Sequence, residues 1–195
     1  MNRTLASAAA LLAAGGVVFA NTAYAADPAA TGAATAKTAG KIQRGQYLVT
    51  TSGCNDCHTP LKMGKNGPEP DLTRLLSGHP EALKMPPAPK LPDGPWLVTV
   101  SATNTAWAGP WGVSFTANLT PDNETGMGTW TLRAFIDTMR IGRHLGAGRP
   151  VLPPMPIPAY KHFSDQDMDA IFSYLRTIPA IKNRVPEPMP PAAAK

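Results

Sequence analysis

The stretch Cys54-Asn55-Asp56-Cys57-His58 decides how this chain is organised, because it holds both cysteines of the 195-residue sequence. Two thiols three positions apart can each add across one vinyl group of the same haem, forming two thioether bonds. The histidine that follows is then held beneath the ring, where its imidazole can bind the iron. The motif therefore predicts one covalent haem c, with Cys54 and Cys57 as attachment points and His58 as the proximal iron ligand.

Two other uses of a Cys-x-x-Cys pair fit the sequence less well. A structural zinc site usually needs two or more further ligands at metal spacing, and the sequence has no second cysteine or histidine pair that matches. A thioredoxin-like dithiol would lie near a βαβ pattern, which is absent here. A chance match or another kind of metal site is the remaining alternative.

The N-terminus has the pattern of a secretory signal. A short basic start precedes an uncharged, Ala-rich run over residues 5–20, and Ala23-Tyr24-Ala25 is an A-x-A cleavage site. An uncleaved membrane anchor is the alternative, but the run is short for a span of about 20 residues. No later stretch is long and apolar enough to cross a membrane. We therefore expect a signal peptide over 1–25 and a soluble protein in a bacterial periplasm. This agrees with the haem motif, because haem is attached to such cysteines outside the cytoplasm.

Composition indicates one domain with much irregular backbone. The sequence has 22 prolines and 17 glycines, so it can bury little apolar surface through sheets or long helices. A large buried cofactor would offset that deficit by forming the centre of the core. The net charge of +5 is mildly basic, and no basic patch interleaved with aromatic residues suggests a nucleic-acid partner. Beyond the signal, we expect a flexible linker over 26–40, a haem domain over 41–185 and a disordered tail over 186–195.

Helical patterns lie at both ends of the predicted domain. Residues 42–51 can form a helix that leads into Cys54. A second helix runs from a cap at Thr129 or Thr131 to about residue 141, where Gly142 ends it. The last helix begins with a capping-box-like sequence at Ser164. The apolar faces of the last two helices share a spacing of three and four and comprise Leu132, Phe135, Ile136, Met139, Met168, Ile171, Phe172 and Leu175.

The passage between the motif and these helices is harder to interpret. Residues 63–70 are rich in glycine and proline, and a carbonyl near Pro68 or Pro70 could accept the Nδ1 proton of His58. Residues 78–112 form a long Pro-rich insertion. Strand-like stretches at 96–100 and 112–116 could pair as a small β-hairpin, with an irregular wrap around the haem edge as the alternative. The expected fold is therefore mostly α, with a small hairpin in the insertion.

The second axial ligand of the iron must come from elsewhere in the chain, unless that position is open. Thioether sulfur is soft and suits haem iron in electron carriers. Met155 lies in the proline-rich loop 153–156 between two amphipathic helices, which makes it the first candidate. The alternatives that remain are Met127, in a Gly-rich turn, and three histidines: His79, His144 and His162.

These features together resemble the class I c-type cytochromes, in particular the single-haem modules in cytochrome subunits of periplasmic alcohol dehydrogenases. The resemblance spans residues 42–185. It implies a cytochrome c fold with N- and C-terminal helices crossing beside the haem, and it implies Met155 as distal ligand opposite His58. The insertion at 78–112 departs from the pattern, as does the presence of one module where those subunits carry several. The matching pieces, in order, are Gly45-Gln46-Tyr47-Leu48-Val49, Cys54 to Pro60, Asn118 to Asp122, Glu124-Thr125-Gly126, Thr129-Trp130-Thr131, Pro153 to Pro156, Ser164 to Met168 and Tyr174-Leu175-Arg176.

The function expected from these features is electron transfer by Fe(III)/Fe(II) cycling, without a catalytic residue. The expected partners are redox proteins such as a periplasmic dehydrogenase or a terminal oxidase. Two alternatives belong to other classes. An open sixth position would favour a haem peroxidase or a gas-binding sensor, and a permanent partner would make the chain a dedicated electron-transfer subunit of one dehydrogenase complex.

Overall fold

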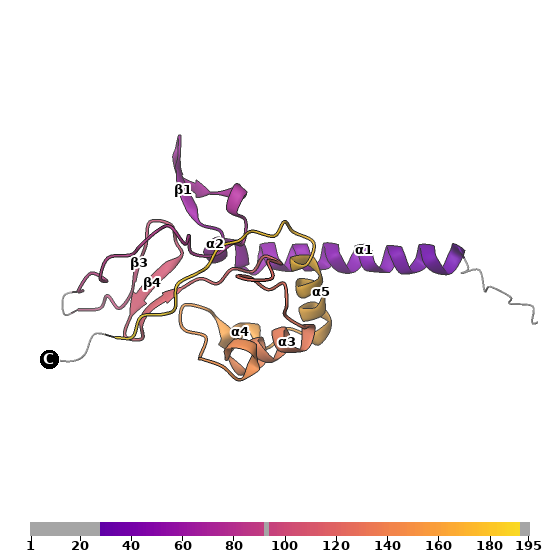
Figure 1. The fold of residues 1–195 in the computed structure, drawn as a ribbon. Coiled ribbons are helices and arrows are strands. Elements are labelled where there is room, and N and C mark those ends of the chain that lie inside the picture. The colour runs from indigo at the N-terminus through magenta and orange to yellow at the C-terminus, as the bar shows by residue number, and fades with distance from the viewer. Residues whose placement is uncertain (1–27, 92–93, 192–195) are drawn as a thin grey trace, which may run out of the picture.

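The structure is a computed structural model that describes residues 28–91 and 94–191. The predicted signal peptide over 1–25 lies outside these ranges. Helices dominate the described chain, and two small antiparallel sheets accompany them (Figure 1). None of the helices in these ranges combines the length and hydropathy that a membrane span needs. The helices are α1 (Pro28–Thr51), α2 (Cys54–His58), α3 (Leu132–Ile141), α4 (Ile157–Tyr160) and α5 (Asp165–Leu175), and the 3-10 turns are η1 (Leu72–Arg74) and η2 (His144–Gly146).

Helix α1 is longer than the sequence predicts. It begins at Pro28, so residues 28–40 are helical, and the prediction of a flexible linker over 26–40 is wrong for that part. Figure 1 shows this N-terminal half of α1 extending beyond the body of the molecule. Helix α1 packs chiefly against α5, and its core residues Leu48 and Val49 lie in its second half. The predicted short helix at 42–51 is therefore the packed end of a longer one.

The crossing of α1 and α5 depends on a glycine. Gly45 is buried, and a Cβ added at this position would overlap the backbone carbonyl of Ala170 in α5. The absence of a side chain thus lets the two helices approach closely. Lys41 and Asp169 form an ion pair of 3.0 Å across the same crossing. Buried side chains on both sides of the crossing form the core, which includes Leu48, Val49, Met168, Ile171 and Leu175.

The ends of the shorter helices confirm the capping predictions. Thr131, rather than Thr129, is the N-cap of α3, and its Oγ1 accepts a hydrogen bond of 3.1 Å from the amide of Ala134. Gly142 ends α3 in the left-handed conformation. Ser164 caps α5 by accepting a 3.0 Å hydrogen bond from the amide of Asp167. The capping residues in the structure therefore lie at the helix boundaries that the sequence predicts.

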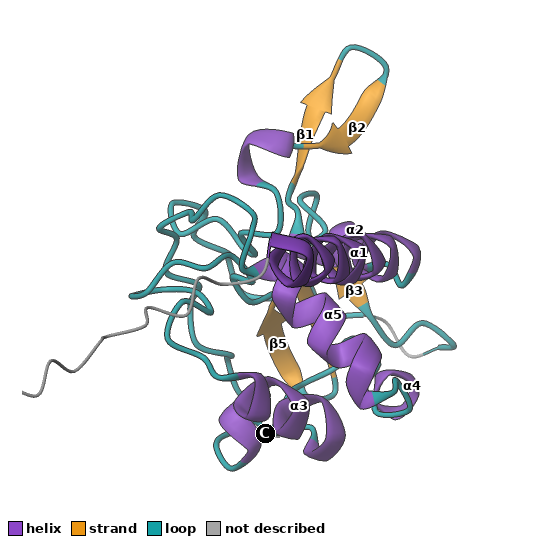
Figure 2. Ribbon diagram, turned by 90° about the vertical axis from the view of Figure 1, so that its right-hand side faces the viewer, coloured by secondary structure: helices purple, strands orange, loops and turns teal. Residues whose placement is uncertain are grey.

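The first sheet is a hairpin of β1 (Leu61–Gly64) and β2 (Gly67–Pro70). It follows the cysteine motif directly and projects from the body of the molecule, as Figure 2 shows. The sequence predicts irregular backbone here, because prolines and glycines are frequent. The hairpin forms nonetheless, since a two-residue turn between Gly64 and Gly67 brings the two short strands into register.

The second sheet begins in the predicted insertion, continues beyond it to residue 115, and has three strands in the order β3-β4-β5. They are β3 (Thr99–Val100), β4 (Ala106–Gly109) and β5 (Gly112–Phe115). The sequence predicts strand-like stretches at 96–100 and 112–116 that could pair with each other, but the first is a strand only at Thr99–Val100 and the two are not paired. In the structure β4 lies between them, so the residues expected to form the hairpin loop are instead its central strand.

The C-terminal segment 176–191 returns across the molecule to β5. Met189 and Val113 exchange two backbone hydrogen bonds of 2.9 Å, and Glu187 forms an ion pair of 3.1 Å with Arg149. The prediction of a disordered tail over 186–195 is therefore wrong for residues 186–191, and residues 192–195 lie outside the described chain. The segment covers the outer edge of β5 that would otherwise lack a neighbouring strand.

Candidate functional site

The cysteine motif forms the short helix α2, which starts after a left-handed turn at Gly53. Cys54 and Cys57 lie one helical turn apart, are both partly buried, and are free thiols. Burial raises the pKa of Cys54 to about 11 and also raises the pKa of Cys57. Reactive dithiols depend on a lowered thiol pKa, and burial acts here in the opposite direction.

Zinc binding is also unsupported by the surroundings of the motif. Within residues 28–91 and 94–191, no group of three or more histidine, cysteine, aspartate or glutamate side chains is arranged to hold a metal ion. A structural zinc site needs four such ligands in a tetrahedron. The pair of thiols therefore has no partners among these side chains for that role.

His58, the last residue of α2, is buried and points one ring nitrogen at a backbone carbonyl. Its Nδ1 donates a hydrogen bond of 2.7 Å to the carbonyl of Ala117. The predicted acceptors near Pro68 or Pro70 are wrong, because those prolines belong to the projecting strand β2. Burial lowers the pKa of His58, although the Ala117 carbonyl partly opposes this. The neutral imidazole is therefore favoured, and its Nε2, which has no hydrogen-bond partner in the described chain, is the nitrogen that can bind a metal.

The backbone around His58 is held by the same segment that contains Ala117. The amide of Gly78 donates to the His58 carbonyl at 2.8 Å, and the amide of His79 donates to the Thr116 carbonyl at 2.9 Å. Gly78 has a φ of 75°, and a Cβ there would overlap the Thr116 and Ala117 backbone. A glycine is needed at this point so that residues 77–79 can pass between the motif and residues 116–117.

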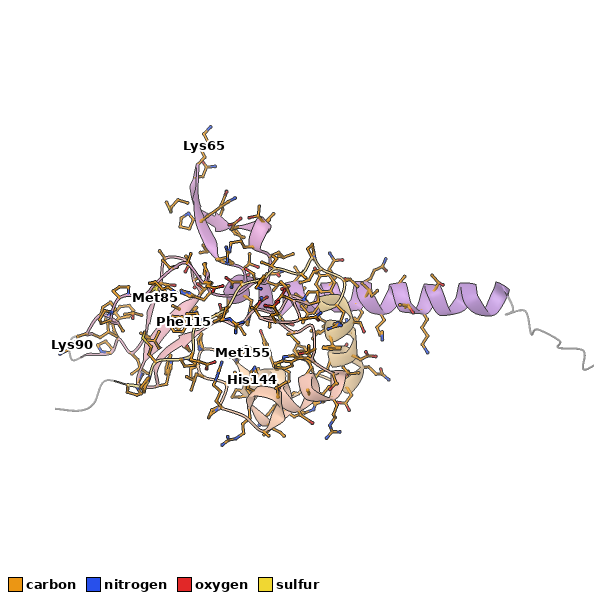
Figure 3. The ribbon with its side chains drawn as sticks, in the orientation of Figure 1. Lys65, Met85, Lys90, Phe115, His144 and Met155 are labelled. Atoms are coloured by element: carbon orange, nitrogen blue, oxygen red, sulfur yellow. The ribbon has the colours of Figure 1, made fainter. Side chains whose placement is uncertain are left out.

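Met155 lies in the short loop before α4 and packs, partly buried, against the hydrophobic core. Figure 3 shows it in the body of the molecule, whereas Lys65 lies at the outer tip of the β1–β2 hairpin. Two side-chain contacts hold the chain on either side of Met155. Before it, Ser114 Oγ of β5 donates to the Pro153 carbonyl at 2.5 Å. After it, the hydroxyl of Tyr160, at the end of α4, donates to the carbonyl of Ser52, two residues before Cys54.

The other candidates for the sixth ligand lie in different surroundings. Both ring nitrogens of His79 are already engaged, at 2.9 Å by Thr105 Oγ1 and at 3.0 Å by the Leu83 carbonyl. The ring of His144 packs edge-on against Trp130, with centroids 5.0 Å apart. His162 is exposed. Met127 is 4% exposed and forms part of the hydrophobic core.

Sequence reasoning missed two residues that the structure brings to the site. Ala117 and Ser114 precede the Asn118–Asp122 turn and are far from both the motif and Met155 in sequence, so no local pattern marks them. Only a contact between distant segments could reveal the roles of Ala117 and Ser114. The tryptophans were not missed, because the sequence suggests that Trp96, Trp107 or Trp111 packs beside the haem or donates its indole N–H to a propionate. The Nε1 atoms of Trp107 and Trp111 are buried and have no hydrogen-bond partner among the described residues.

Comparison with known families agrees with this geometry. Residues 42–179 match the family described as "Cytochrome c". That range includes α2, the second sheet, the Met155 loop and all of α5. The chain belongs to the cytochrome c family.

The chain is distantly similar to cytochrome c subunits of quinone-dependent dehydrogenases. It is 27% identical over 153 residues to the fructose dehydrogenase cytochrome subunit of Gluconobacter japonicus, covering 75% of this chain and 24% of that protein. It is 28% identical over 150 residues to the cytochrome c subunit of alcohol dehydrogenase (quinone) of Gluconobacter oxydans, with coverage of 75% and 24%. A third match, 27% identical over 133 residues, covers 68% of this chain and 22% of the gluconate 2-dehydrogenase cytochrome c subunit of Pantoea cypripedii. The chain therefore spans about a quarter of the length of these relatives.

Proposed function

We propose that this protein carries electrons through one haem c. In this proposal Cys54 and Cys57 form the thioether bonds, and His58 and Met155 are the axial ligands of the iron. The observation that carries it is the state of His58: directly after two free thiols lies a buried imidazole whose Nδ1 is occupied by a carbonyl. That arrangement leaves a neutral Nε2 for iron, as a ligating histidine needs.

The unsatisfied polar atoms of the second sheet also fit a haem. The indole Nε1 atoms of Trp107 and Trp111 are buried without a hydrogen-bond partner in the described chain. A buried N–H without an acceptor costs about 1–3 kcal/mol, and a haem propionate could accept a hydrogen bond from it. When bound, the haem supplies one-electron cycling between Fe(III) and Fe(II).

The protein's own residues contribute position and rigidity. The Ala117 carbonyl fixes the tautomer and ring orientation of His58. The contacts of Ser114 and Tyr160 hold the Met155 loop. Axial side chains that stay in place in both oxidation states keep structural rearrangement small, which favours rapid electron transfer over substrate binding.

The relatives suggest the kind of partner. Their names describe subunits of fructose, alcohol and gluconate dehydrogenases, so we propose electron exchange with a dehydrogenase, in the periplasm after removal of residues 1–25. Two of the four cations that flank the distal loop are balanced within the chain: Arg140 pairs with Asp165 at 2.6 Å, and Arg149 pairs with Glu187 at 3.1 Å. Arg143 and Lys161 have no ion pair within the described residues, so they are the cations that could steer an acidic partner.

Mass spectrometry and redox titration of the exported, purified protein test the proposal. The expected mass is that of the processed chain plus one haem, and the expected titration is a reversible one-electron step. Replacing Cys54 and Cys57 together by Ala should remove the pigment from the polypeptide in a denaturing gel. Pigment that separates from the parent chain under the same conditions would contradict covalent attachment.

A further inference from the structure

Strand β5 and the two residues after it contact both sides of the proposed haem site. Ser114 Oγ donates to the carbonyl of Pro153, two residues before Met155, at 2.5 Å. Ala117 accepts the 2.7 Å hydrogen bond from His58 Nδ1. The two contacts are three residues apart in extended backbone, a span of about 10 Å. One short segment thus joins the loop of one axial side chain to the ring of the other.

This segment, residues 114–117, is held along β4. Phe115 pairs with Ala106 in β4, and the amide of Thr116 donates to the Thr105 carbonyl at 3.0 Å. On the outer edge of β5 the contact is made by the preceding residue, Val113, which pairs with Met189. Sliding of the segment would break these bonds, so it can act as a fixed support.

The Ser114 hydroxyl is committed to the distal loop. Ser114 is only 7% exposed, and its other polar contact, to the Trp107 carbonyl at 3.4 Å, is much longer. Ser114 and Trp107 are directly paired across β4 and β5, so their side chains lie on the same face of the sheet. The hydroxyl that faces the loop therefore has one short partner, the Pro153 carbonyl.

We propose that Ser114 is a positioning residue for Met155: its hydrogen bond to the Pro153 carbonyl keeps the Met155 sulfur at the iron. This inference rests on the proposed function. Removing the hydroxyl should leave haem attachment and His58 unaffected, because Ala117 uses its backbone carbonyl. It should raise the fraction of time in which Met155 is detached. A neutral hydrogen bond of ordinary strength corresponds to about a fivefold change in such an equilibrium.

The test is the rate at which carbon monoxide binds to the reduced holoprotein, since carbon monoxide can enter only when the methionine has left. Ser114→Ala should bind it about fivefold faster than the parent. Ser114→Thr keeps a hydroxyl on the strand and should stay close to the parent rate. Ser173→Ala is the matched control, because it removes a serine hydroxyl that bonds Asp169 within α5, and it should bind at the parent rate.

The other outcomes separate the two proposals. A parent-like rate in Ser114→Ala, even with a lower free energy of unfolding, would assign the residue a structural role alone and overturn the inference. An equally fast rate in Ser114→Thr would do the same. A parent protein that binds carbon monoxide at once, and lacks the sulfur-to-iron charge-transfer band in the far red, would overturn the proposed ligation itself and with it the role of Ser114.

Discussion

The Nδ1 of His58 donates a hydrogen bond of 2.7 Å to the carbonyl of Ala117, a residue 59 positions later in the sequence. The bond connects the cysteine motif to the end of the second sheet. It selects the tautomer in which Nε2 can bind iron, and it ties the orientation of the ring to the position of β5. Strand β4, in the insertion at 78–112, pairs with β5, so the insertion helps to fix the position of this acceptor.

The α1–α5 crossing gives a prediction with a control in the same helix. Gly45→Ala should destabilise the protein strongly, by more than about 3 kcal/mol, since the added Cβ would overlap the Ala170 backbone. Gly40→Ala adds the same methyl group where no atom lies within 4 Å and should stabilise the helix by about 0.5–1 kcal/mol. Chemical denaturation of both variants measures the difference. Equal effects of the two substitutions would contradict the close crossing.

Asn183 gives a second stability prediction, because its side chain joins four backbone or side-chain groups while being 1% exposed. Its Nδ2 donates to the carbonyls of Ser77 and His79, at 2.7 and 2.9 Å. Its Oδ1 accepts from Arg74 Nη2 and from the Glu81 amide, at 2.8 and 2.9 Å. Asn183→Ala would leave these buried groups without partners and should lower the free energy of unfolding by about 3 kcal/mol.

The control for this variant is Asn66→Ala, at the exposed turn of the β1–β2 hairpin. It should change the free energy of unfolding by no more than about 0.5 kcal/mol. If Asn183→Ala lowers the free energy of unfolding as little as the control does, the C-terminal segment does not anchor residues 74–81.

Features that depend on neighbouring residues could be predicted from the sequence. The cysteine motif, the cap at Ser164 and the stop at Gly142 each lie within one helical turn of the backbone that they shape. The amphipathic spacing in α3 and α5 likewise predicts which faces are buried. The crossing of N- and C-terminal helices follows from the family resemblance, and the glycine that permits it is among the matching residues.

Features that depend on pairing between distant segments could not be predicted from the sequence. The strand Ala106–Gly109 has little β-branched character, so its composition does not distinguish it from a loop; it is a strand because β3 and β5 flank it. The Pro-rich C-terminal segment looks disordered in isolation but is ordered by β5. The sequence suggests an acceptor for His58 nearby in the chain, whereas folding brings it from Ala117.

Tyr160 gives a prediction about pH. Burial is the main cause that raises the pKa of Tyr160 from 10.0 to about 12, and its hydroxyl donates to the Ser52 carbonyl. Because the folded state favours the protonated phenol, this contact stabilises fully below about pH 10 and is lost as pH rises through about 12. Tyr160→Phe should cost about 1 kcal/mol at neutral pH, and that cost should shrink as pH rises above 10 and be gone before pH reaches about 12.

Unfolding measurements on parent and variant across this pH range measure the cost directly, and the difference in phenolate absorption between the two proteins reports the titration of Tyr160 itself. A titration midpoint for Tyr160 near 10, the ordinary tyrosine pKa, would mean that its hydroxyl is not held in the buried contact with Ser52.

We propose that His58 and Met155 bind the iron from opposite sides and leave no open position. Optical spectra of the ferric parent protein and of Met155→Ala distinguish this ligation from an open site, with the far-red sulfur-to-iron charge-transfer band as the readout. The parent should show the band. Met155→Ala should keep its covalent haem but lose the band, have a lower reduction potential and bind carbon monoxide when reduced. A variant with the same band and potential as the parent would show that Met155 is not the ligand.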